Sequence, residues 1–568
     1  METGKPVNPN MGEKAHVSTW VRVSLSPFPR LLLWLFPLLF LSSFFFLPFA
    51  RILSLAFNTS ALTTENFHLA FSILRFTIYQ ATISTILTFL LGIPSAILFA
   101  RFDFRGKSLL RALTAVPFML PTVVVAAAFN SLLGLRGWLH TIFPLSSFEF
   151  TGTLTAILIA HVFYNTTIVI RMVSTALSRL DLKLEQVARS LGADSHRVWW
   201  HVTLPLLRPS LLAAALLVFL FDFTSFGVIL LLGGTRFATL EVEIYLRVLK
   251  LPNLPLAALL SIIQLVFTLL ISILYTRVVN QTTVQTAPRF STSRRPQSVR
   301  EKIYVASFIF LLSSFFILPL ASLPLRSLTR LEADRGQRGE VQYGLTTDYY
   351  EELFINRRGS LFYVPPIQAA LNSLGFAGLT VLISLALGFP AALALAKPTR
   401  LEKFLDPLIM LPLGSSAVML GLGFILSFGR ALSSPVFIPL AHTLVALPFV
   451  IRTLQPAIAS IPEQLRQAAS TLGATPLRVW QHVDWPILSR ATLAAATFAF
   501  TISLGEFGAT LLLSRPEFPT IPIAISRFLS QPGGLNYGQA MAMSTVLMAL
   551  TVAGILLIER VRIHSSDV

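Results

Sequence analysis

The sequence predicts an all-α integral membrane protein with about twelve transmembrane helices, arranged as two parallel six-helix repeats. Three observations support this prediction. The chain of 568 residues is 54% hydrophobic and only 12% charged, which is more apolar surface than a soluble core buries. The apolar residues form blocks of about 20 to 30, long enough for a helix to cross a hydrocarbon layer of roughly 30 Å. The two halves of the sequence also match each other in a fixed register.

The apolar blocks place six candidate spans in each half. The first six are 31–56, 72–100, 112–134, 152–173, 207–233 and 255–278. The second six are 303–325, 366–396, 404–428, 434–453, 488–513 and 538–558. The block that begins at Leu31 is long and is followed by further spans, so we expect a first transmembrane helix there and no cleavable signal peptide.

Basic residues gather in every second loop between these spans. They are Arg101, Arg105, Lys107 and Arg111, the basic residues of 171–208 and 277–302, then Lys397, Arg400 and Lys403, and finally Arg560 and Arg562. Because Lys and Arg accumulate in cytoplasmic loops, we expect both termini to be cytoplasmic in a multi-pass protein of a bacterial-type inner or plasma membrane. This distribution explains the net charge of +18 without a nucleic-acid partner.

These features divide the chain into five segments. They are a cytoplasmic N-terminal segment (1–30), a first transmembrane domain (31–278), a linker (279–302), a second transmembrane domain (303–560) and a cytoplasmic tail (561–568). The linker is polar, basic and contains Pro and Ser, as expected between two membrane domains. The longest outside loop, 326–365, mixes acids and bases, and it is either a docking surface or an ordinary solvated loop.

Catalytic chemistry is not predicted for this chain. The phosphate-binding motif G-x-x-x-x-G-K-[ST] does not occur, so ATP hydrolysis would need another subunit. The absence of cysteine excludes disulfides, thiolate metal sites and cysteine nucleophiles. The nine histidines have no spacing typical of a metal site, and helix packing is the preferred interpretation of His161 and His442.

A shift of 281 positions aligns the two halves, and the register does not slip. The shift pairs His161 with His442, Gly192 with Gly473, Trp199 with Trp480, and Pro205 with Pro486. Chance similarity between apolar segments would not match these residue types. Because six spans separate the copies, both begin on the same side of the membrane, which indicates parallel repeats about an axis along the membrane normal.

The strongest match lies between the fourth and fifth spans. It is EQVARSLGADSHRVWWHVTLPLLRP (185–209) in one half and RQAASTLGATPLRVWQHVDWPILSR (466–490) in the other. Each copy predicts a helix, a reversal at Gly192 or Gly473, and a second short helix, because glycine permits the sharp turn. Pro205 and Pro486 fit the first turn of the next membrane helix. The sequence therefore predicts a two-helix lug projecting from each half.

This pattern resembles the EAA loop of permeases of binding-protein-dependent ABC importers of type I, which reads E-A-A, three residues, Gly, nine residues, hydrophobic-x-Leu-Pro. Here Gln186 and Gln467 replace the usual Glu, Glu185 lies one position early, and Trp485 replaces the usual Leu. These differences question a salt bridge at the first position of the motif. The resemblance covers nearly the whole chain, through two six-span units, and implies the MetI-like fold.

The resemblance implies that each lug is a coupling helix seated on one ATPase subunit. The residues that it assigns to the coupling loops are Gln186, Ala188, Gly192, Arg197, Pro205, Gln467, Ala469, Gly473, Arg478 and Pro486. It also implies two copies of an ABC ATPase with ATP and Mg²⁺, a separate extracytoplasmic substrate-binding protein, and no cofactor on this chain. For Trp199, Trp480, His201 and His482, packing within the lug is an equal alternative to contact with the ATPase.

Three further stretches are similar to the thiamine and ferric iron permeases of this family. They are AHVFYN (160–165), SFGVILLLGGTRFATLEVEIY (225–245) and LGEFGATLLLSRPEFPTIPIAI (504–525). The first-half stretch is slightly more like the thiamine permeases, whereas the second half does not decide between them. Both cargoes carry positive charge, and a separate binding protein selects the ligand in such systems.

One acidic residue lies inside the fifth span of each half. Ionisable residues within a span are costly, so Asp222 and Glu506 are functional candidates. In the repeat register Glu506 aligns with Ser225, three residues from Asp222, so the three residues could line a pathway that attracts a cation. The alternative, of equal weight, is that each acid pairs with a nearby polar group or reaches toward the interface.

Three other classes of membrane protein compete with the permease interpretation. An ion-coupled secondary transporter can also have two parallel six-helix halves, but it needs no paired lugs. An ion-pumping subunit would need more intramembrane Lys, Glu or His for a relay. A passive channel explains neither the lugs nor the buried acids. The permease of an ABC importer is therefore the preferred function.

Overall fold

The structure is a computed structural model that describes residues 27–142, 150–282, 293–330, 344–356 and 364–563. In the first half the elements, with η for 3₁₀ and π turns, are α1 (Pro27–Leu41), η2 (Ser42–Phe46), α2 (Leu47–Ala56), α3 (Thr64–Arg101), α4 (Lys107–Met119), α5 (Thr122–Leu133), α6 (Trp138–Ile142), α7 (Leu154–Arg179), α8 (Leu182–Ser190), α9 (Ser195–Val198), η3 (Trp199–Thr203), α10 (Leu204–Phe223), η4 (Ile229–Gly233), η5 (Gly234–Phe237), α11 (Leu240–Leu249) and α12 (Leu254–Thr282).

The second half repeats this order. Its elements are α13 (Val299–Ser327), α14 (Asp348–Glu351), η6 (Glu352–Phe354), α15 (Gln368–Ala396), α16 (Arg400–Gly414), α17 (Ala417–Phe428), η7 (Gly429–Ser433), α18 (Phe437–Ala459), α19 (Glu463–Thr471), α20 (Pro476–Val479), η8 (Trp480–Asp484), α21 (Trp485–Gly505), α22 (Gly508–Leu513), α23 (Ile521–Leu529) and α24 (Gly534–Ile563). In the described ranges the only β-type pairing is isolated bridges, and no strand forms. The predicted all-α membrane fold is confirmed.

Ten described helices are long and apolar enough to cross a membrane, and one bent pair, 400–414 with 417–433, would make eleven. Helix α24 overlaps the predicted span 538–558, and the side chains of most of its last residues lie outside the described part of the chain. The predicted N-terminal segment, the middle of the linker and part of the loop 326–365 also lie outside the described residues.

Four predicted spans are not continuous, which corrects their boundaries. The span 112–134 breaks between α4 and α5, and the span 404–428 bends by 97° between α16 and α17. The fifth span of each half ends early, α10 at Phe223 and α21 at Gly505, before a separate short helix. At the first break Leu120 is extended because it precedes Pro121, which disfavours helical geometry in the residue before it.

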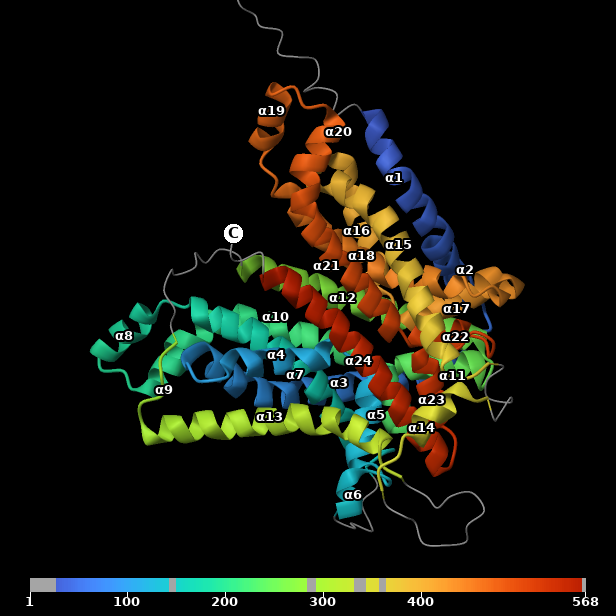
Figure 1. Cartoon of the computed structure of the whole chain (residues 1–568), viewed down its shortest axis with the longest axis horizontal. Coiled ribbons are helices and arrows are strands. Elements are labelled where there is room, and N and C mark those ends of the chain that lie inside the picture. Colours follow the sequence, from blue (N-terminus) through green and yellow to red (C-terminus); the bar gives the residue numbers. More distant parts are fainter. Residues whose placement is uncertain (1–26, 143–149, 283–292, 331–343, 357–363, 564–568) are drawn as a thin grey trace, which may run out of the picture.

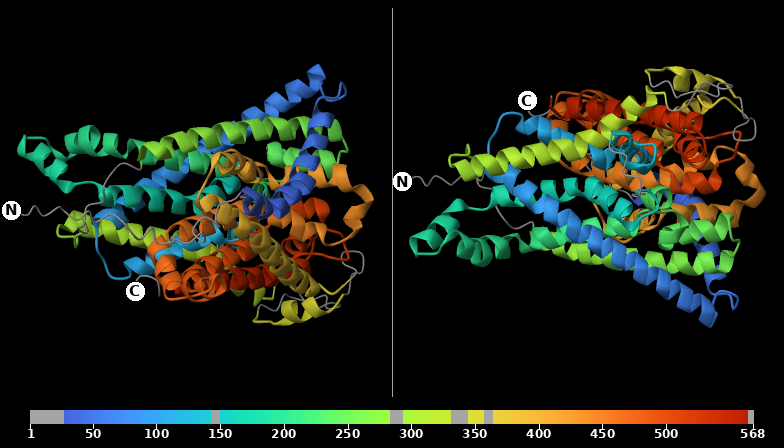
Figure 2. Two further views of the ribbon diagram at one scale, coloured as in Figure 1. Left: turned by 90° about the horizontal axis from the view of Figure 1, so that it is seen from above. Right: turned by 90° about the horizontal axis from the view of Figure 1, so that it is seen from below.

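The first helix of each half packs on the other half. Helices α1 and α2 lie against α15 and α17, whereas α13 lies against α4 and α5 (Figures 1 and 2). Trp34 on α1 is fully buried, and its indole N–H donates to Glu402 of α16 over 3.4 Å. In return, the hydroxyl of Tyr304 on α13 donates to the carbonyl of Pro94 on α3 over 2.5 Å. Each half therefore packs with the first helix of the other half, so the packing does not follow the predicted domain boundaries. The boundaries themselves remain a prediction.

The long helices of the two halves diverge toward the two ends that carry the predicted lugs. Figure 1 shows α8 and α9 at the left end of the first half, and α19 and α20 at the top of the second. The two halves meet around α5, α11, α17 and α22, where a large apolar cluster joins residues from both repeats. The fold thus has a shared core at one end. At the other end the long helices of each half form a separate arm that carries its lug.

Repeat-related glycines allow a close helix contact in each half. A Cβ atom on Gly92 of α3 would lie 2.7 Å from Val169 of α7, and one on Gly388 of α15 would lie 2.7 Å from Val450 of α18. Real Cβ atoms do not approach so closely, so both helix pairs depend on the missing side chain.

Gly92→Val is expected to lower the thermal midpoint of the purified protein, because overpacking of a close contact costs about 1–3 kcal/mol. The matched control is Gly375→Ala on α15, where a Cβ atom meets nothing within 4 Å. Alanine at this helical position should leave the midpoint unchanged or raise it slightly. Equal midpoints for Gly92→Val and the native chain would contradict the packing described here.

Candidate functional site

The first lug (182–203) contains the predicted reversal. Helix α8 ends before Gly192, which adopts a left-handed φ of +85°, and the N–H of Ala193 returns to the carbonyl of Ala188 over 3.0 Å. The carboxylate of Asp194 then accepts from the N–H of Arg197 over 2.9 Å and caps α9. These bonds satisfy the groups that a helix end leaves open, so the turn is locally encoded.

The second lug (463–484) repeats this geometry. Gly473 has a φ of +81°, and Ala474 N–H bonds to the carbonyl of Ala469 over 3.0 Å. Pro205 and Pro486 lie in the first turns of α10 and α21. The predicted reversals at glycine and the predicted positions of both prolines are confirmed.

The residues assigned to the coupling loops have matching exposure in the two lugs. Gln186, Gly192, Arg197, Pro205 and their counterparts Gln467, Gly473, Arg478 and Pro486 are exposed, whereas Ala188 and Ala469 are half-buried. The most exposed apolar residues of the two lugs are Leu191 and Leu472, at 84% and 88%. An exposed leucine thus occupies the same repeat-related position on both lugs. The ATPase-coupling role of these residues stays a prediction.

Ion pairs hold each lug to its own half, with the charges distributed differently. In the first lug, both oxygens of Glu185 accept from the guanidinium of Arg101 at the end of α3, with Nη1 at 2.9 Å from Oε2. Thr203 also donates to Glu185 Oε1 over 2.9 Å. Glu185 therefore makes the ion pair that the sequence left in question, one position before the motif's first residue.

In the second lug the repeat counterpart of Glu185 is a base. Arg466 Nε donates to Asp484 Oδ1 over 2.8 Å, and Asp484 occupies the position of Thr203. Lys397, at the counterpart of Arg101, donates to Glu463 over 2.7 Å. The two lugs thus have the same backbone and different electrostatic attachments.

Each lug is continuous with a membrane helix. In the first half α9, the π turn η3 and α10 form one helix from Ser195 to Phe223, and the second half has one from Pro476 to Gly505. At 1.5 Å per residue, each extends over roughly 45 Å. A displacement of either lug is therefore transmitted to the residues where these helices end.

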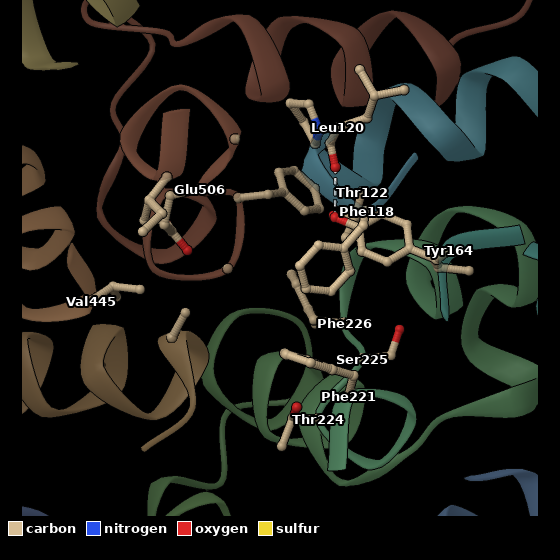
Figure 3. A pocket seen from close by; sticks show the side chains of 18 of the residues that line it. Phe118, Leu120, Thr122, Tyr164, Phe221, Thr224, Ser225, Phe226, Val445 and Glu506 are labelled. Atoms are coloured by element: carbon tan, nitrogen blue, oxygen red, sulfur yellow. Dashed lines mark hydrogen bonds between the residues drawn. The ribbon is translucent and has the colours of Figure 1, made fainter. Parts of the chain in front are cut away.

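The four helix breaks surround one cavity of about 420 Å³ between the halves. It is lined by Phe118, Met119, Leu120, Pro121, Thr122, His161, Tyr164, Asn165, Phe221, Thr224, Ser225, Phe226, Gly227, Val228, Glu241, Ala417, Val418, Val445, Phe449, Phe498, Thr501, Ile502, Gly505, Glu506, Phe507 and Gly508. Figure 3 shows the rings of Phe118 and Phe226 between Glu506 on one side and Ser225 on the other. Aromatic walls with a few polar groups are typical of small-molecule sites of roughly 300–1,000 Å³.

Of the three predicted pathway residues, two line this cavity. Ser225 and Glu506 are on its wall, whereas Asp222 is fully buried outside the lining. Glu506 accepts from the N–H groups of Ala509 and Thr510 over 3.0 Å each. A role of any of the three in transport stays a prediction.

Two histidines, interpreted from the sequence as packing residues, form the centre of a polar cluster in each half. The ring of His161 contacts Ser84 over 3.0 Å and Ser225 over 2.9 Å, and its Nδ1 lies 3.3 Å from Asp222. The ring of His442 contacts Ser503 and Thr510 over 2.7 Å each, and its Nε2 lies 3.3 Å from Glu506. Asp222 and Glu506 therefore both lie beside a polar partner, as one of the two interpretations from the sequence expected.

Glu241 is a cavity residue that the sequence did not single out. It lies on α11, accepts from Gln264 over 2.5 Å and accepts from Ser416 of the second half over 2.6 Å. The stretch TLEVEIY contains it together with Glu243, but two acids in a segment outside the predicted spans gave no signal of burial.

Known proteins resemble this chain over most of its length. Residues 89–284 match the family model of the binding-protein-dependent transport system inner membrane component. The thiamine transport system permease protein of Brucella abortus (strain 2308) is 28% identical, over 86% of this chain and 87% of that protein. The thiamine transport system permease protein of Escherichia coli K12 is 25% identical, over 82% and 85%. A probable ABC transporter permease protein of Sinorhizobium fredii is 24% identical, over 85% and 86%.

The attachment of the first lug should respond to pH. Burial by itself raises the pKa of Glu185, but the hydrogen bonds and charge of Arg101, with Thr203, outweigh it and hold the pKa below its ordinary value of 4.5. A lowered pKa stabilises the folded lug above pH 4.5, and this contribution disappears as the pH falls through the lowered value.

Glu185→Gln is expected to speed amide hydrogen exchange in 182–190 at neutral pH by roughly fivefold, or ~1 kcal/mol for a partly buried ion pair. The exchange in 463–471 of the same molecule is the internal control and should not change. The exposed neighbour gives a second control, Gln186→Ala, with native exchange. Equal exchange for Glu185→Gln and the native chain would show that the ion pair does not hold the lug.

Proposed function

We propose that this chain is a fused two-domain permease of the binding-protein-dependent ABC importer family and that it carries thiamine through the cavity between its halves. Two copies of a separate ATPase subunit, one on each lug, bind ATP and Mg²⁺ and drive the cycle. An extracytoplasmic binding protein delivers the cargo. The chain itself is the translocation subunit, and both of its termini face the cytoplasm.

The exposed leucines of the lugs are the observation that supports ATPase docking most directly. Leu191 and Leu472 lie at the tips of the two reversals, and Arg197 and Arg478 are exposed beside them. Exposed apolar groups gain free energy when a partner buries them, and arginine is enriched among the residues that dominate binding energy at protein interfaces. Their repeat symmetry fits two identical partners.

The continuous helices supply a mechanism for alternating access. Phe223 and Gly505 end the two helices that begin in the lugs, and the residues that follow line the cavity. When ATP brings the two ATPase subunits together, the lugs approach each other and the ends of α10 and α21 move with them. This rigid-body change opens the cavity to one side of the membrane and closes it to the other.

The cavity wall fits a flat organic cation. Seven aromatic residues line it: Phe118, Tyr164, Phe221, Phe226, Phe449, Phe498 and Phe507. Aromatic faces attract a cation, and the carboxyl groups of Glu241 and Glu506 can balance its charge in a low-dielectric region. Thiamine has two aromatic rings and a permanent positive charge, so this chemistry supports the cargo named for the relatives. Ferric iron, the other cargo that the sequence left open, is the competing ligand in the test.

Leu191→Asp with Leu472→Asp is expected to abolish co-purification of the ATPase, because a charge would replace each leucine that the ATPase buries in the complex. Leu345→Asp is the matched control, since this leucine is also 88% exposed but lies between α13 and α14, away from the lugs. Retention of the ATPase by the double variant would contradict docking at the lugs. Transport of cargo under an ion gradient without ATP would replace the permease by a secondary transporter.

Glu241→Gln is expected to lower ATP-dependent thiamine uptake into proteoliposomes roughly tenfold, because one charge that attracts the cation is lost. The ATPase should still co-purify. Thr501→Val in the same wall removes a buried hydroxyl that has no partner among the described residues, so transport should stay within about twofold of the native rate. If the native importer moves ferric iron and not thiamine, the cargo assignment is wrong while the permease assignment stands.

A further inference from the structure

A cluster of buried oxygen atoms at the end of α10 is not used by the proposed transport cycle. It consists of the side chains of Gln80 on α3, Asn165 on α7 and Asp222 on α10, which are 0%, 2% and 0% exposed. Asn165 Nδ2 donates to Asp222 Oδ1 over 2.7 Å, and Gln80 Nε2 donates to the backbone carbonyl of Asp222 over 2.8 Å. The three side chains thus form one connected group where three helices pack together.

Each of these side chains retains one oxygen without a donor among the described residues. The oxygens are Gln80 Oε1, Asn165 Oδ1 and Asp222 Oδ2, all inaccessible to solvent. The amide orientations are fixed, because turning either amide would place its oxygen against an oxygen of Asp222. Buried polar atoms are nearly always paired, so three unpaired acceptors in one group indicate a missing positive partner.

We propose that Gln80, Asn165 and Asp222 bind a monovalent alkali-metal cation such as Na⁺. Carboxylate and amide oxygens are the ligands that hard cations prefer, and the single carboxylate balances one positive charge. A proton on Asp222 would supply one donor for one acceptor and leave the remaining amide oxygen unpaired. Among the described residues no group of three or more His, Cys, Asp or Glu gathers, and a site rich in neutral amides suits a monovalent ion.

The position in the fold supports the same ligand. Asp222 is the penultimate residue of α10, and the C-terminal end of a helix carries partial negative charge. Ends of interrupted membrane helices are places where transport proteins coordinate small cations. Asn165 also lines the cavity, so the cluster borders the cavity wall.

The second half has no equivalent cluster. In the repeat register Phe376, Ala446 and Ser503 replace Gln80, Asn165 and Asp222. Each acid lies 3.3 Å from a histidine ring, Asp222 Oδ1 from His161 and Glu506 Oε2 from His442. Both oxygens of Glu506 accept backbone N–H groups, from Ala509 and Thr510, whereas Asp222 Oδ2 has no donor among the described residues. The oxygens around Asp222 are therefore a local specialisation of the first half. A bound ion on this chain also departs from the expectation that it binds no cofactor and no metal.

The test is thermal unfolding of the purified full chain in nanodiscs, titrated with NaCl, KCl or LiCl against choline chloride at constant ionic strength. We expect a saturable rise of about 2–5 °C with at least one alkali cation. Asp222→Asn should lose this rise. Ser503→Ala, at the repeat-related position, should keep it. These measurements need neither ATPase nor cargo. The ion proposal can therefore fail while the proposed function stands, and the proposed function can fail while the ion proposal stands.

A second variant keeps the test decisive if Asp222→Asn does not fold. Gln80→Leu retains the carboxylate and should raise the half-saturating cation concentration by at least about tenfold. The proposal is overturned if the native midpoint is the same in all four salts, or if the rise persists in Asp222→Asn. It is also overturned if the native chain loses stability only with rising pH and ignores the alkali cations, since a proton would then occupy the cluster.

Discussion

In a lipid environment every backbone N–H and C=O group needs a partner, so a membrane helix can stop only where protein or water surrounds its end. This constraint explains why four interrupted helices converge on one cavity. Polar side chains satisfy the freed groups there: Tyr164 donates to the carbonyl of Leu120 over 2.6 Å, and Gln80 donates to that of Asp222. Glu506 accepts from the first N–H groups of α22. The buried polar residues are thus a consequence of the breaks.

Both halves have the same helix framework around their breaks, but an acid and a serine exchange positions between them. A histidine lies at the centre of each half, beside Ser84 in the first and near Thr380 in the second, which occupy equivalent positions. The acid and the serine then change places: Asp222 precedes Ser225 on one side, and Ser503 precedes Glu506 on the other. Only the second arrangement brings its carboxylate to the cavity wall. A duplicated fold therefore provides one asymmetric site.

The sequence predicted what depends on local patterns. The helices, the repeat, and the reversals at Gly192 and Gly473 follow from hydropathy and from residues that only a sharp turn requires. The helix breaks were missed, because Pro94 lies inside an unbroken helix while Pro121 ends one, and tertiary packing decides between these outcomes. Glu241 was missed for the same reason, since its burial depends on Ser416 from the other half.

The exchanged first helices have a consequence for how the two arms move. Helix α1 is anchored to α16 through Trp34 and Glu402, and α13 is anchored to α3 through Tyr304, so each arm carries a helix that belongs in sequence to the other. A rotation of one arm therefore pulls on the chain of its partner. Because the core at α5, α11, α17 and α22 is shared, the arms can change their angle only by repacking around the cavity. The same closely packed residues thus set both the range of the arm motion and the shape of the cavity.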